Sequence, residues 1–176
     1  MGELNLRDAR DGERDELLAL TLAAYEEFAA TMPDGEWPRY RENIVGTLRD
    51  VRPAEQIVAE SGGAVVGTAL LYPAGSRFVG PDGAGITFRW PETRLLAVAP
   101  AARGRGVGGA IIWECIRRAS AAGADAITLH TTDFMPVAMG MYERMGFERA
   151  PELDFMPAPD VLVKGYRLPL GGAAGK

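Results

Sequence analysis

The stretch from Thr93 to Ile112 reads Thr-Arg-Leu-Leu-Ala-Val-Ala-Pro-Ala-Ala-Arg-Gly-Arg-Gly-Val-Gly-Gly-Ala-Ile-Ile. Its apolar run, Leu95 to Ala99, predicts a buried strand that Pro100 ends. The basic, glycine-rich segment from Arg103 to Gly109 predicts a turn, and the residues from Ala110 onward predict a helix with an apolar stripe. A strand, a glycine turn and a helix N-terminus together favour an anion site, because the amides of the first helical turn have no intrahelical acceptor.

The turn also matches the pattern G-x-G-x-x-G, which is typical of dinucleotide-binding enzymes, from Gly104 to Gly109. That pattern normally follows its strand at once and opens a βαβ unit, whereas here Pro100-Ala-Ala-Arg intervenes and a long segment precedes the strand. The acidic residue expected at the end of the next strand is missing, since Asp125 comes before that strand. A dinucleotide-binding enzyme is therefore the weaker interpretation. A turn whose glycines serve only packing remains a second alternative.

The composition predicts one globular domain over residues 1–170 and a flexible tail over residues 171–176. The net charge of −5 disfavours nucleic acid as a partner, which needs a broad basic face. Cys115 is the single cysteine of the chain, which excludes an internal disulfide and favours a reducing compartment. With no signal sequence and no long apolar run, we expect a cytoplasmic protein without a membrane partner.

Periodicity and turn signals predict further elements around the central stretch. We expect helices from Asp11 to Phe28, from about Pro38 to Arg49 and from Pro136 to Met145. We expect strands at 4–7, 56–60, 64–72, 125–131, 147–149 and 160–168, the second and third joined by a hairpin turn at 61–63. The segment from Pro73 to Pro91 is either a functional loop or a short hairpin that turns at residues 80–83.

Two motifs in this order resemble those of one family. Arg103-x-x-Gly106-x-Gly108, preceded by the strand end 96–98, resembles the acyl-CoA-binding motif of the GNAT N-acetyltransferases. The segment 129–147 resembles the strand–helix block of that family, with A-x-x-x-Y-x-x-x-G-F running from Ala138 to Phe147. The resemblance implies an α+β (α/β) fold in one domain, with splayed central strands in a mixed sheet of about seven strands and about four helices.

The resemblance also implies acetyl-CoA as cosubstrate. In the family, the end of the fourth strand holds the pantetheine and the acyl carbonyl, which corresponds to Leu96, Ala97 and Val98. The pyrophosphate lies on the turn, which corresponds to Arg103, Gly104, Arg105, Gly106, Val107, Gly108 and Gly109. The pantetheine fills the gap between the splayed strands, and residues 128–131 would form the other side of this gap.

The implied reaction moves an acetyl group to a primary amine of a small molecule or a peptide by direct attack. Tyr142 corresponds to the tyrosine that faces the sulfur and acts as general acid, unless it is simply a core aromatic. Glu92 lies where family members often carry a base that acts through water, although a solvated strand-end carboxylate is an equal alternative. Where many members have an asparagine, this chain has Met135, and Thr132 or Asp133 are the residues that would replace its cofactor contact.

Other residues are weaker candidates. His130 is the single histidine, and a lone strand histidine more often packs than catalyses. We expect Cys115 in the core and no metal site, because no Cys/His cluster exists. An acceptor pocket could draw on acidic residues (Glu26, Glu27, Asp34, Glu36) and aromatic residues (Phe28, Trp37, Tyr40, Phe78, Trp90).

A non-catalytic acyl-CoA sensor is the alternative function. Family members are often dimers, so a homodimer is an open possibility for this chain.

Overall fold

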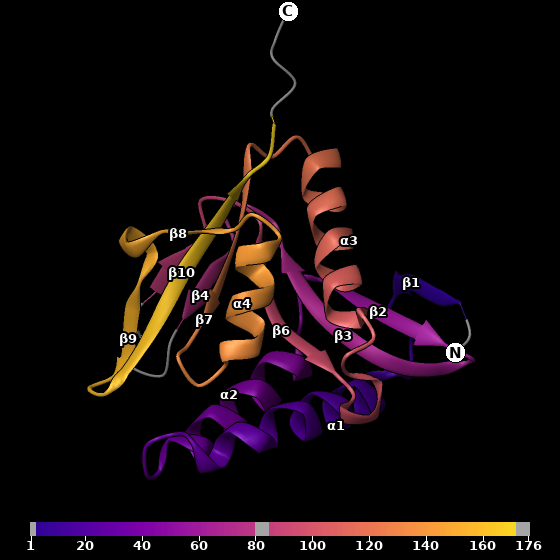
Figure 1. The fold of residues 1–176 in the computed structure, drawn as a ribbon, viewed down its shortest axis with the longest axis horizontal. Helices are drawn as coiled ribbons and strands as arrows, with labels where there is room; N and C mark the ends of the chain where they lie inside the picture. Colours follow the sequence, from indigo (N-terminus) through magenta and orange to yellow (C-terminus); the bar gives the residue numbers. More distant parts are fainter. Residues whose placement is uncertain (1–2, 80–84, 172–176) are drawn as a thin grey trace, which may run out of the picture. The chain divides into compact units, whose positions relative to one another are not determined.

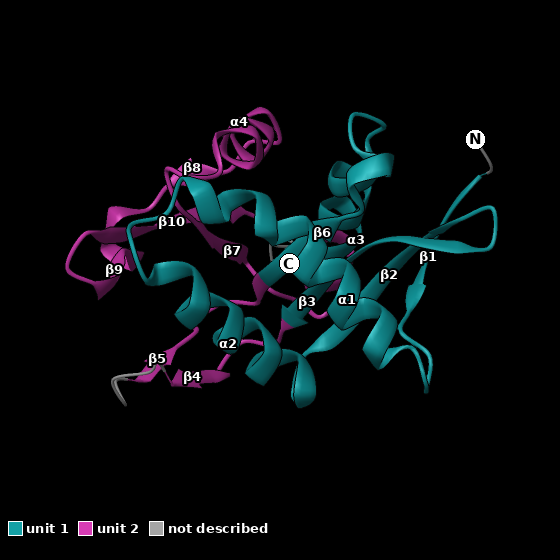
Figure 2. Cartoon of the chain, turned by 90° about the horizontal axis from the view of Figure 1, so that it is seen from below, with its two compact units in different colours: residues 1–71, 94–115 teal, residues 72–93, 116–176 magenta. Residues whose placement is uncertain are grey.

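The computed structural model describes residues 3–79 and 85–171, and Figure 1 traces the chain. The chain divides into two compact units, which Figure 2 colours separately. Unit 1 comprises residues 1–71 and 94–115, and unit 2 comprises residues 72–93 and 116–176. Strand β6, Glu92–Val98, contributes to both units, because the division falls between Thr93 and Arg94.

Unit 1 contains an antiparallel group of strands, two helices between its first two strands, and the start of α3. Its elements are β1 Leu4–Asp8, α1 Arg14–Tyr25, a 3₁₀ helix Glu26–Ala30, α2 Glu36–Arg49, β2 Glu55–Ser61, β3 Ala64–Tyr72, most of β6, a 3₁₀ helix Pro100–Ala102 and the first part of α3 Val107–Ala121. β2 pairs with β1 and β3 in antiparallel register. The hairpin predicted between β2 and β3 is confirmed: Gly62 and Gly63 have φ of 60° and 81°, as a type I′ turn requires.

The first turns of α3 lie directly on β3. A Cβ atom placed on Gly67 would come within 2.8 Å of Ile111 Cδ1 and 3.0 Å of both Val107 Cγ1 and the Ala97 carbonyl oxygen. Only glycine permits this approach, so the sequence of β3 fixes how closely α3 packs. Ile111, Ile112 and Cys115 on α3 are fully buried, as the apolar stripe predicted.

Unit 2 contains the C-terminal strands and the helix α4. Its elements are β4 Arg77–Val79, β5 Gly85–Thr87, the start of β6, the end of α3, β7 Ala126–Thr131, α4 Pro136–Arg144, β8 Glu148–Arg149, a 3₁₀ helix Pro151–Leu153, β9 Phe155–Ala158 and β10 Val161–Pro169. β10 pairs with β7, β8 and β9, always antiparallel. β4 and β5 form a separate antiparallel pair.

The strand order is β1-β2-β3-β6-β7-β10-β8, with β9 on β10, so the main sheet has eight strands. The sheet is mixed, because β6 and β7 pair in parallel while the other ladders described are antiparallel. The parallel ladder holds two residue pairs, Glu92 with Thr128 and Thr93 with Leu129, although β6 continues to Val98 and β7 to Thr131. The predicted α/β fold with a mixed sheet and four helices is confirmed.

Two local predictions need correction. The helix expected from Ala110 begins at Val107, so the last residues of the supposed turn form the first turn of α3. The helix expected to reach Phe28 ends at Tyr25, and a 3₁₀ helix follows it. The hairpin alternative for the segment 73–91 is confirmed by the antiparallel pair β4–β5, while the predicted turn at residues 80–83 lies outside the described residues, as does the tail from residue 172.

None of the helices in the described part of the chain combines the length and the apolar character that crossing a membrane requires.

Candidate functional site

The segment between β6 and α3 brings a run of glycines to the N-terminus of a 15-residue helix. Gly104 and Gly106 have φ of 70° and 79°, in the left-handed region that a side chain makes costly. These conformations let the backbone reverse between the 3₁₀ helix and α3. The amides of Val107 and Gly109 then lie in the first helical turn, where the peptide dipoles favour an anion.

No other part of the described chain fills the space beside the glycines of this turn. A Cβ atom placed on Gly104, Gly106 or Gly109 would meet no other atom within 4 Å. Gly109 has no positive φ, so neither packing nor backbone conformation in this chain explains why a glycine stands there. An exposed backbone without side chains is what a phosphate needs to approach the amides, and the turn therefore fits the pyrophosphate of an acyl-CoA.

Arg103 connects the turn to the end of α1. Its Nη1 forms an ion pair with Glu27, and its Nη2 donates a hydrogen bond of 2.9 Å to the Ala24 carbonyl oxygen. A guanidinium at this place also interacts favourably with the C-terminal end of the helix dipole. The sequence predicted that Arg103 contacts the pyrophosphate. In the structure its guanidinium instead contacts Ala24 of α1 and Glu27, the residue that follows shortly after α1. Glu27 is thereby paired, as Glu36 is with Arg39 at 2.5 Å.

The strand end that precedes the turn has an alternating burial. Ala97 is buried at 2% exposure, whereas Leu96 and Val98 are half-buried. Leu95 has φ of 50°, an unusual conformation for a bulky residue, and it interrupts the regular extended backbone of β6. The strand therefore changes its geometry between Glu92 and the three residues predicted to hold the acyl arm.

Unit 2 contains a cluster of buried polar side chains around Glu92. The Glu92 carboxylate is 1% exposed. Its Oε2 accepts a hydrogen bond from the Thr128 hydroxyl, and its Oε1 lies 2.6 Å from His130 Nδ1. His130 Nε2 donates to the Leu153 carbonyl oxygen at 2.9 Å. The alternative of a solvated carboxylate is therefore wrong for Glu92, since burial and two hydrogen bonds hold it.

The parallel register of β6 and β7 explains this cluster. Glu92 is paired with Thr128, and side chains two residues apart on a strand share a face. His130 therefore lies on the same face as Thr128 and one step further along β7. The ring of Phe155 on β9 packs edge-on against the imidazole at 5.3 Å. We name the group formed by Glu92, Thr128 and His130 the Glu92 cluster.

Three threonine hydroxyls of unit 2 are buried without a hydrogen-bond partner among the described residues, Thr93 Oγ1, Thr131 Oγ1 and Thr132 Oγ1. Native proteins satisfy most buried hydroxyls, so such a group of them indicates a missing polar partner. The amides and carbonyls of a pantetheine arm would supply one. Of the two residues predicted to replace the family asparagine at Met135, Thr132 carries such a hydroxyl, while Asp133 is paired with Lys164 at 2.5 Å.

Tyr142 lies on the buried side of α4 at 6% exposure, with its ring 5.9 Å from that of Phe147. Gly146, with φ of 92°, lets the chain leave the helix and return Phe147 against the tyrosine, whose carbonyl oxygen accepts the Phe147 amide at 3.0 Å. The Tyr142 side chain is therefore packed in the interior of unit 2 against Phe147. Its part in proton transfer remains a prediction.

The aromatic residues predicted for an acceptor pocket differ in their contacts and burial. Phe28 and Tyr40 pack on Tyr25, with ring centroids 6.0 and 5.8 Å apart. Burial raises the pKa of Tyr40 to about 12. Trp90 is held by other contacts, since its Nε1 donates to Asp125 at 2.7 Å. Trp37 and Phe78 are half-buried.

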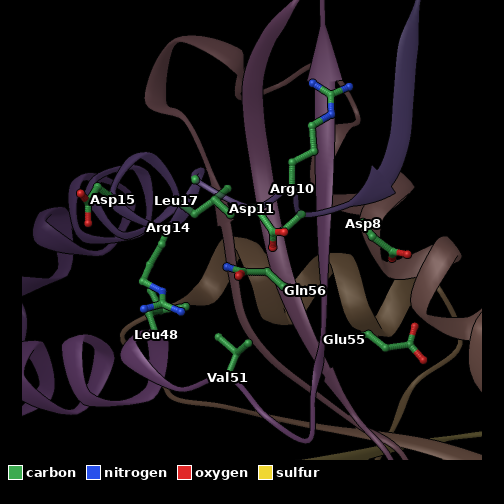
Figure 3. A pocket seen from close by; sticks show the side chains of 12 residues that line it. Asp8, Arg10, Asp11, Arg14, Asp15, Leu17, Leu48, Val51, Glu55 and Gln56 are labelled. Atoms are coloured by element: carbon green, nitrogen blue, oxygen red, sulfur yellow. The ribbon is translucent and has the colours of Figure 1, made fainter.

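A hollow of about 630 Å³ lies at the other end of α1 from Arg103. It is lined by Asp8, Ala9, Arg10, Asp11, Gly12, Arg14, Asp15, Leu17, Leu48, Val51, Glu55 and Gln56. Figure 3 shows acidic and basic side chains around it, contributed by the loop before α1, by α1 itself and by the start of β2. None of the residues predicted to be catalytic, to bind acetyl-CoA or to bind the acceptor lines this hollow. Across residues 3–79 and 85–171, no three His, Cys, Asp or Glu side chains are grouped to hold a metal ion.

Comparison with known proteins agrees with these features. The family model described as "Acetyltransferase (GNAT) family" matches residues 18–147, which include both the turn and Tyr142. The mycothiol acetyltransferase of Nocardia farcinica (strain IFM 10152) is 33% identical over 155 residues, which cover 87% of this chain and 44% of that protein. The chain thus spans less than half the length of this curated relative.

Solved structures share the fold. A GNAT family acetyltransferase from Brucella melitensis in complex with acetyl-CoA is 25% identical, with a TM-score of 0.64 over 97% of this chain and 90% of that one. A GNAT family acetyltransferase from Staphylococcus aureus Mu50 has a TM-score of 0.68 at 17% identity, over 94% of this chain and 98% of that one.

Proposed function

This chain belongs to the acetyltransferase (GNAT) family, and we propose on that premise that it transfers an acetyl group from acetyl-CoA to a primary amine. The observation that carries the proposal is the open glycine turn at the start of α3. Its backbone amides are presented at a helix N-terminus, and no side chain of the described chain fills the space beside Gly109.

The residues suited to acetyl-CoA are described for each unit by itself. In unit 1, the turn from Gly104 to Gly109 would bind the pyrophosphate through its amides, and the strand end 96–98 would bind the acyl arm. In unit 2, the orphaned hydroxyls of Thr93, Thr131 and Thr132 are the polar groups suited to the amides of the pantetheine. Acetyl-CoA supplies the thioester carbon that the amine attacks and a thiolate that leaves.

Two side chains of unit 2 are assigned to proton transfer. An alkylamine is protonated at neutral pH and must lose a proton before it attacks. The carboxylate of Glu92 is the acceptor we assign to that proton, through water. The phenol of Tyr142 is the donor we assign to the departing sulfur.

The acceptor is proposed at the level of its chemistry, as a primary amine of a small molecule or a peptide. The proteins with similar sequence or fold differ in this respect: one is the mycothiol acetyltransferase, and a solved structure at 21% identity is a ribosomal-protein-alanine N-acetyltransferase from Brucella melitensis. The net charge of −5 suits a cationic amine. Among the acidic residues predicted for the acceptor, Glu26 and Asp34 are exposed, and Glu27 and Glu36 are paired with arginines.

The first test is acetyl-CoA binding measured by isothermal titration. Gly109→Trp places a large side chain in the space proposed for the phosphates, and we expect at least a 100-fold loss of affinity, about 2.7 kcal/mol. Gly46→Trp is the matched control, because Gly46 on α2 also has nothing within 4 Å of its Cβ position. Equal affinities in the two variants would refute the phosphate site.

The second test is acceptor-dependent thiol release from acetyl-CoA across polyamines, aminoglycosides, amino acids and peptides. We expect release with at least one class of amine and none in the Gly109→Trp variant. Binding of acetyl-CoA without release by any amine would favour the alternative, a non-catalytic acyl-CoA sensor.

A further inference from the structure

The hydrogen bonds of the Glu92 cluster define where its protons lie. A carbonyl oxygen can only accept, so the contact between His130 Nε2 and the Leu153 oxygen requires a proton on Nε2. Nδ1 and Glu92 Oε1 are 2.6 Å apart, which is a hydrogen-bond distance. Two bare acceptors would repel each other there, so one proton lies between the imidazole and the carboxyl group.

The other carboxylate oxygen faces a rotatable donor. The Thr128 hydroxyl donates to Glu92 Oε2 and also lies 3.3 Å from the Pro91 carbonyl oxygen. The cluster is therefore a chain of four contacts that ends on a backbone carbonyl oxygen at each side. Three protons are available for the four contacts: one on Nε2, one shared by Nδ1 and Oε1, and one on the hydroxyl. The longest contact, between Thr128 and Pro91, is the one that lacks its proton.

We propose that Glu92 and His130 share one proton and act as a single base, with His130 as a positioning residue that orients the carboxylate and holds the shared proton. This proposal rests on the proposed function, because it concerns the base of that reaction. A proton taken from the amine goes to Glu92 Oε2, and the Thr128 hydroxyl then turns to donate to the Pro91 oxygen. No other bond forms or breaks in the cluster, and all four contacts then have a proton.

The surroundings of the imidazole favour a shared proton. From β6, Glu92 faces Nδ1, and from β7, Thr128 lies beside the carboxylate. Beyond the 3₁₀ helix, Asp154 interacts electrostatically with His130 and is hydrogen-bonded to Arg149, which holds the pKa of Asp154 below its usual range. From β9 the imidazole meets the apolar ring of Phe155. Burial makes two isolated charges costly here, and sharing one proton avoids that cost.

The chain has one histidine, so nitrogen NMR of the imidazole reports on His130 without assignment. The measurement uses the full chain without a polyhistidine tag and without acetyl-CoA. We expect Nε2 to stay protonated from pH 5 to pH 8, the range in which a free imidazole with a pKa of about 6.5 would change its protonation. A mixture of both tautomers that titrates like free histidine would overturn the proposal.

The variant Glu92→Gln removes the anionic partner of the imidazole. Because an opposite charge favours the protonated form, we expect the His130 titration midpoint to fall by at least about one pH unit. Glu148→Gln is the control, since Glu148 is an exposed carboxylate of β8 in the same unit, and should leave the midpoint in place. Equal midpoints in the two variants would contradict the shared proton. This measurement needs no turnover, so its outcome is independent of whether the proposed function is correct.

Two substitutions of His130 separate orientation from packing. His130→Asn places an amide donor near the position of Nδ1 and keeps the contact to Glu92, while His130→Gln places a donor near that of Nε2 and keeps only the contact to Leu153. We expect kcat to fall about 100-fold with His130→Gln and about 10-fold with His130→Asn, at unchanged acetyl-CoA affinity. In both variants the acidic limb of the kcat–pH profile should move, because the imidazole no longer shares the proton. Equal losses of any size in the two variants would show that His130 only packs.

Discussion

The glycine turn of unit 1 and the Glu92 cluster of unit 2 are two ways of building a polar site. The turn is made of backbone, and its positive-φ glycines keep side chains away from the amides at the start of α3. The cluster is made of side chains, and its carboxylate and hydroxyl are almost completely buried. The turn should therefore be sensitive to any added Cβ atom, and the cluster to the loss of a single functional group.

This difference also separates binding from chemistry. A backbone site binds a phosphate in the same way throughout a reaction, so its loss should appear as weaker binding of acetyl-CoA. A side-chain cluster that moves a proton acts only when the amine reacts, so its loss should appear in kcat. The following predictions test that separation, beginning with the largest expected effect.

Replacing Glu92 by Gln should lower kcat by about 100- to 1,000-fold. The glutamine side chain has nearly the same shape as glutamate, but its amide cannot accept a proton. Acetyl-CoA affinity, measured by titration calorimetry, should change less than about twofold, within the error of such measurements. A large loss of affinity with little loss of kcat would mean that the cluster serves binding, and the separation between the two regions would fail.

Replacing Tyr142 by Phe should lower kcat about 10- to 100-fold without a comparable change in acetyl-CoA affinity, since the ring still packs on Phe147. Tyr166→Phe is the matched control, because Tyr166 is a buried tyrosine of the same unit, whose hydroxyl contacts Glu143 at 3.2 Å. Unchanged turnover with Tyr142→Phe would reassign Tyr142 to the core.

Replacing Gly106 by Ala should weaken acetyl-CoA about 10-fold and destabilise the fold by about 1 kcal/mol, because a methyl group at positive φ strains the backbone. Gly12→Ala introduces the same strain away from the turn, since Gly12 has φ of 92° and open space around its Cβ position. Chemical denaturation should give similar losses of stability for both. A loss of affinity shared by Gly12→Ala would trace the effect to stability instead of to the turn.

Replacing Arg103 by Met should have the smallest effect on binding, less than about fivefold, because its guanidinium contacts Glu27 and Ala24 of the same unit. We expect a loss of stability of about 1 kcal/mol, which a Glu27→Gln background should largely remove. Salt-dependent loss of acetyl-CoA affinity well beyond fivefold would instead show that Arg103 contacts the phosphates directly.

Much of the first region could be predicted from the sequence. Pro100 ends the strand, and Gly104 and Gly106 are suited to the left-handed conformation that the turn requires. Such signals are local, because each depends on the conformations open to one residue and its neighbours. The start of α3 was predicted about one helical turn too late, because the helix begins at Val107. Gly108 and Gly109 follow, and glycine has a low helix propensity, so the sequence gives no helical signal there.

The sequence by itself determined the family, the order of the main elements and the turn proposed for the phosphates, because these depend on motifs and short-range preferences. Only the tertiary structure decided that Glu92 meets His130 across 38 positions of the chain, and that Arg103 binds the end of α1. The physical reason is that both contacts depend on strand register and helix packing between distant segments. A local pattern of residues determines neither the strand register nor the helix packing.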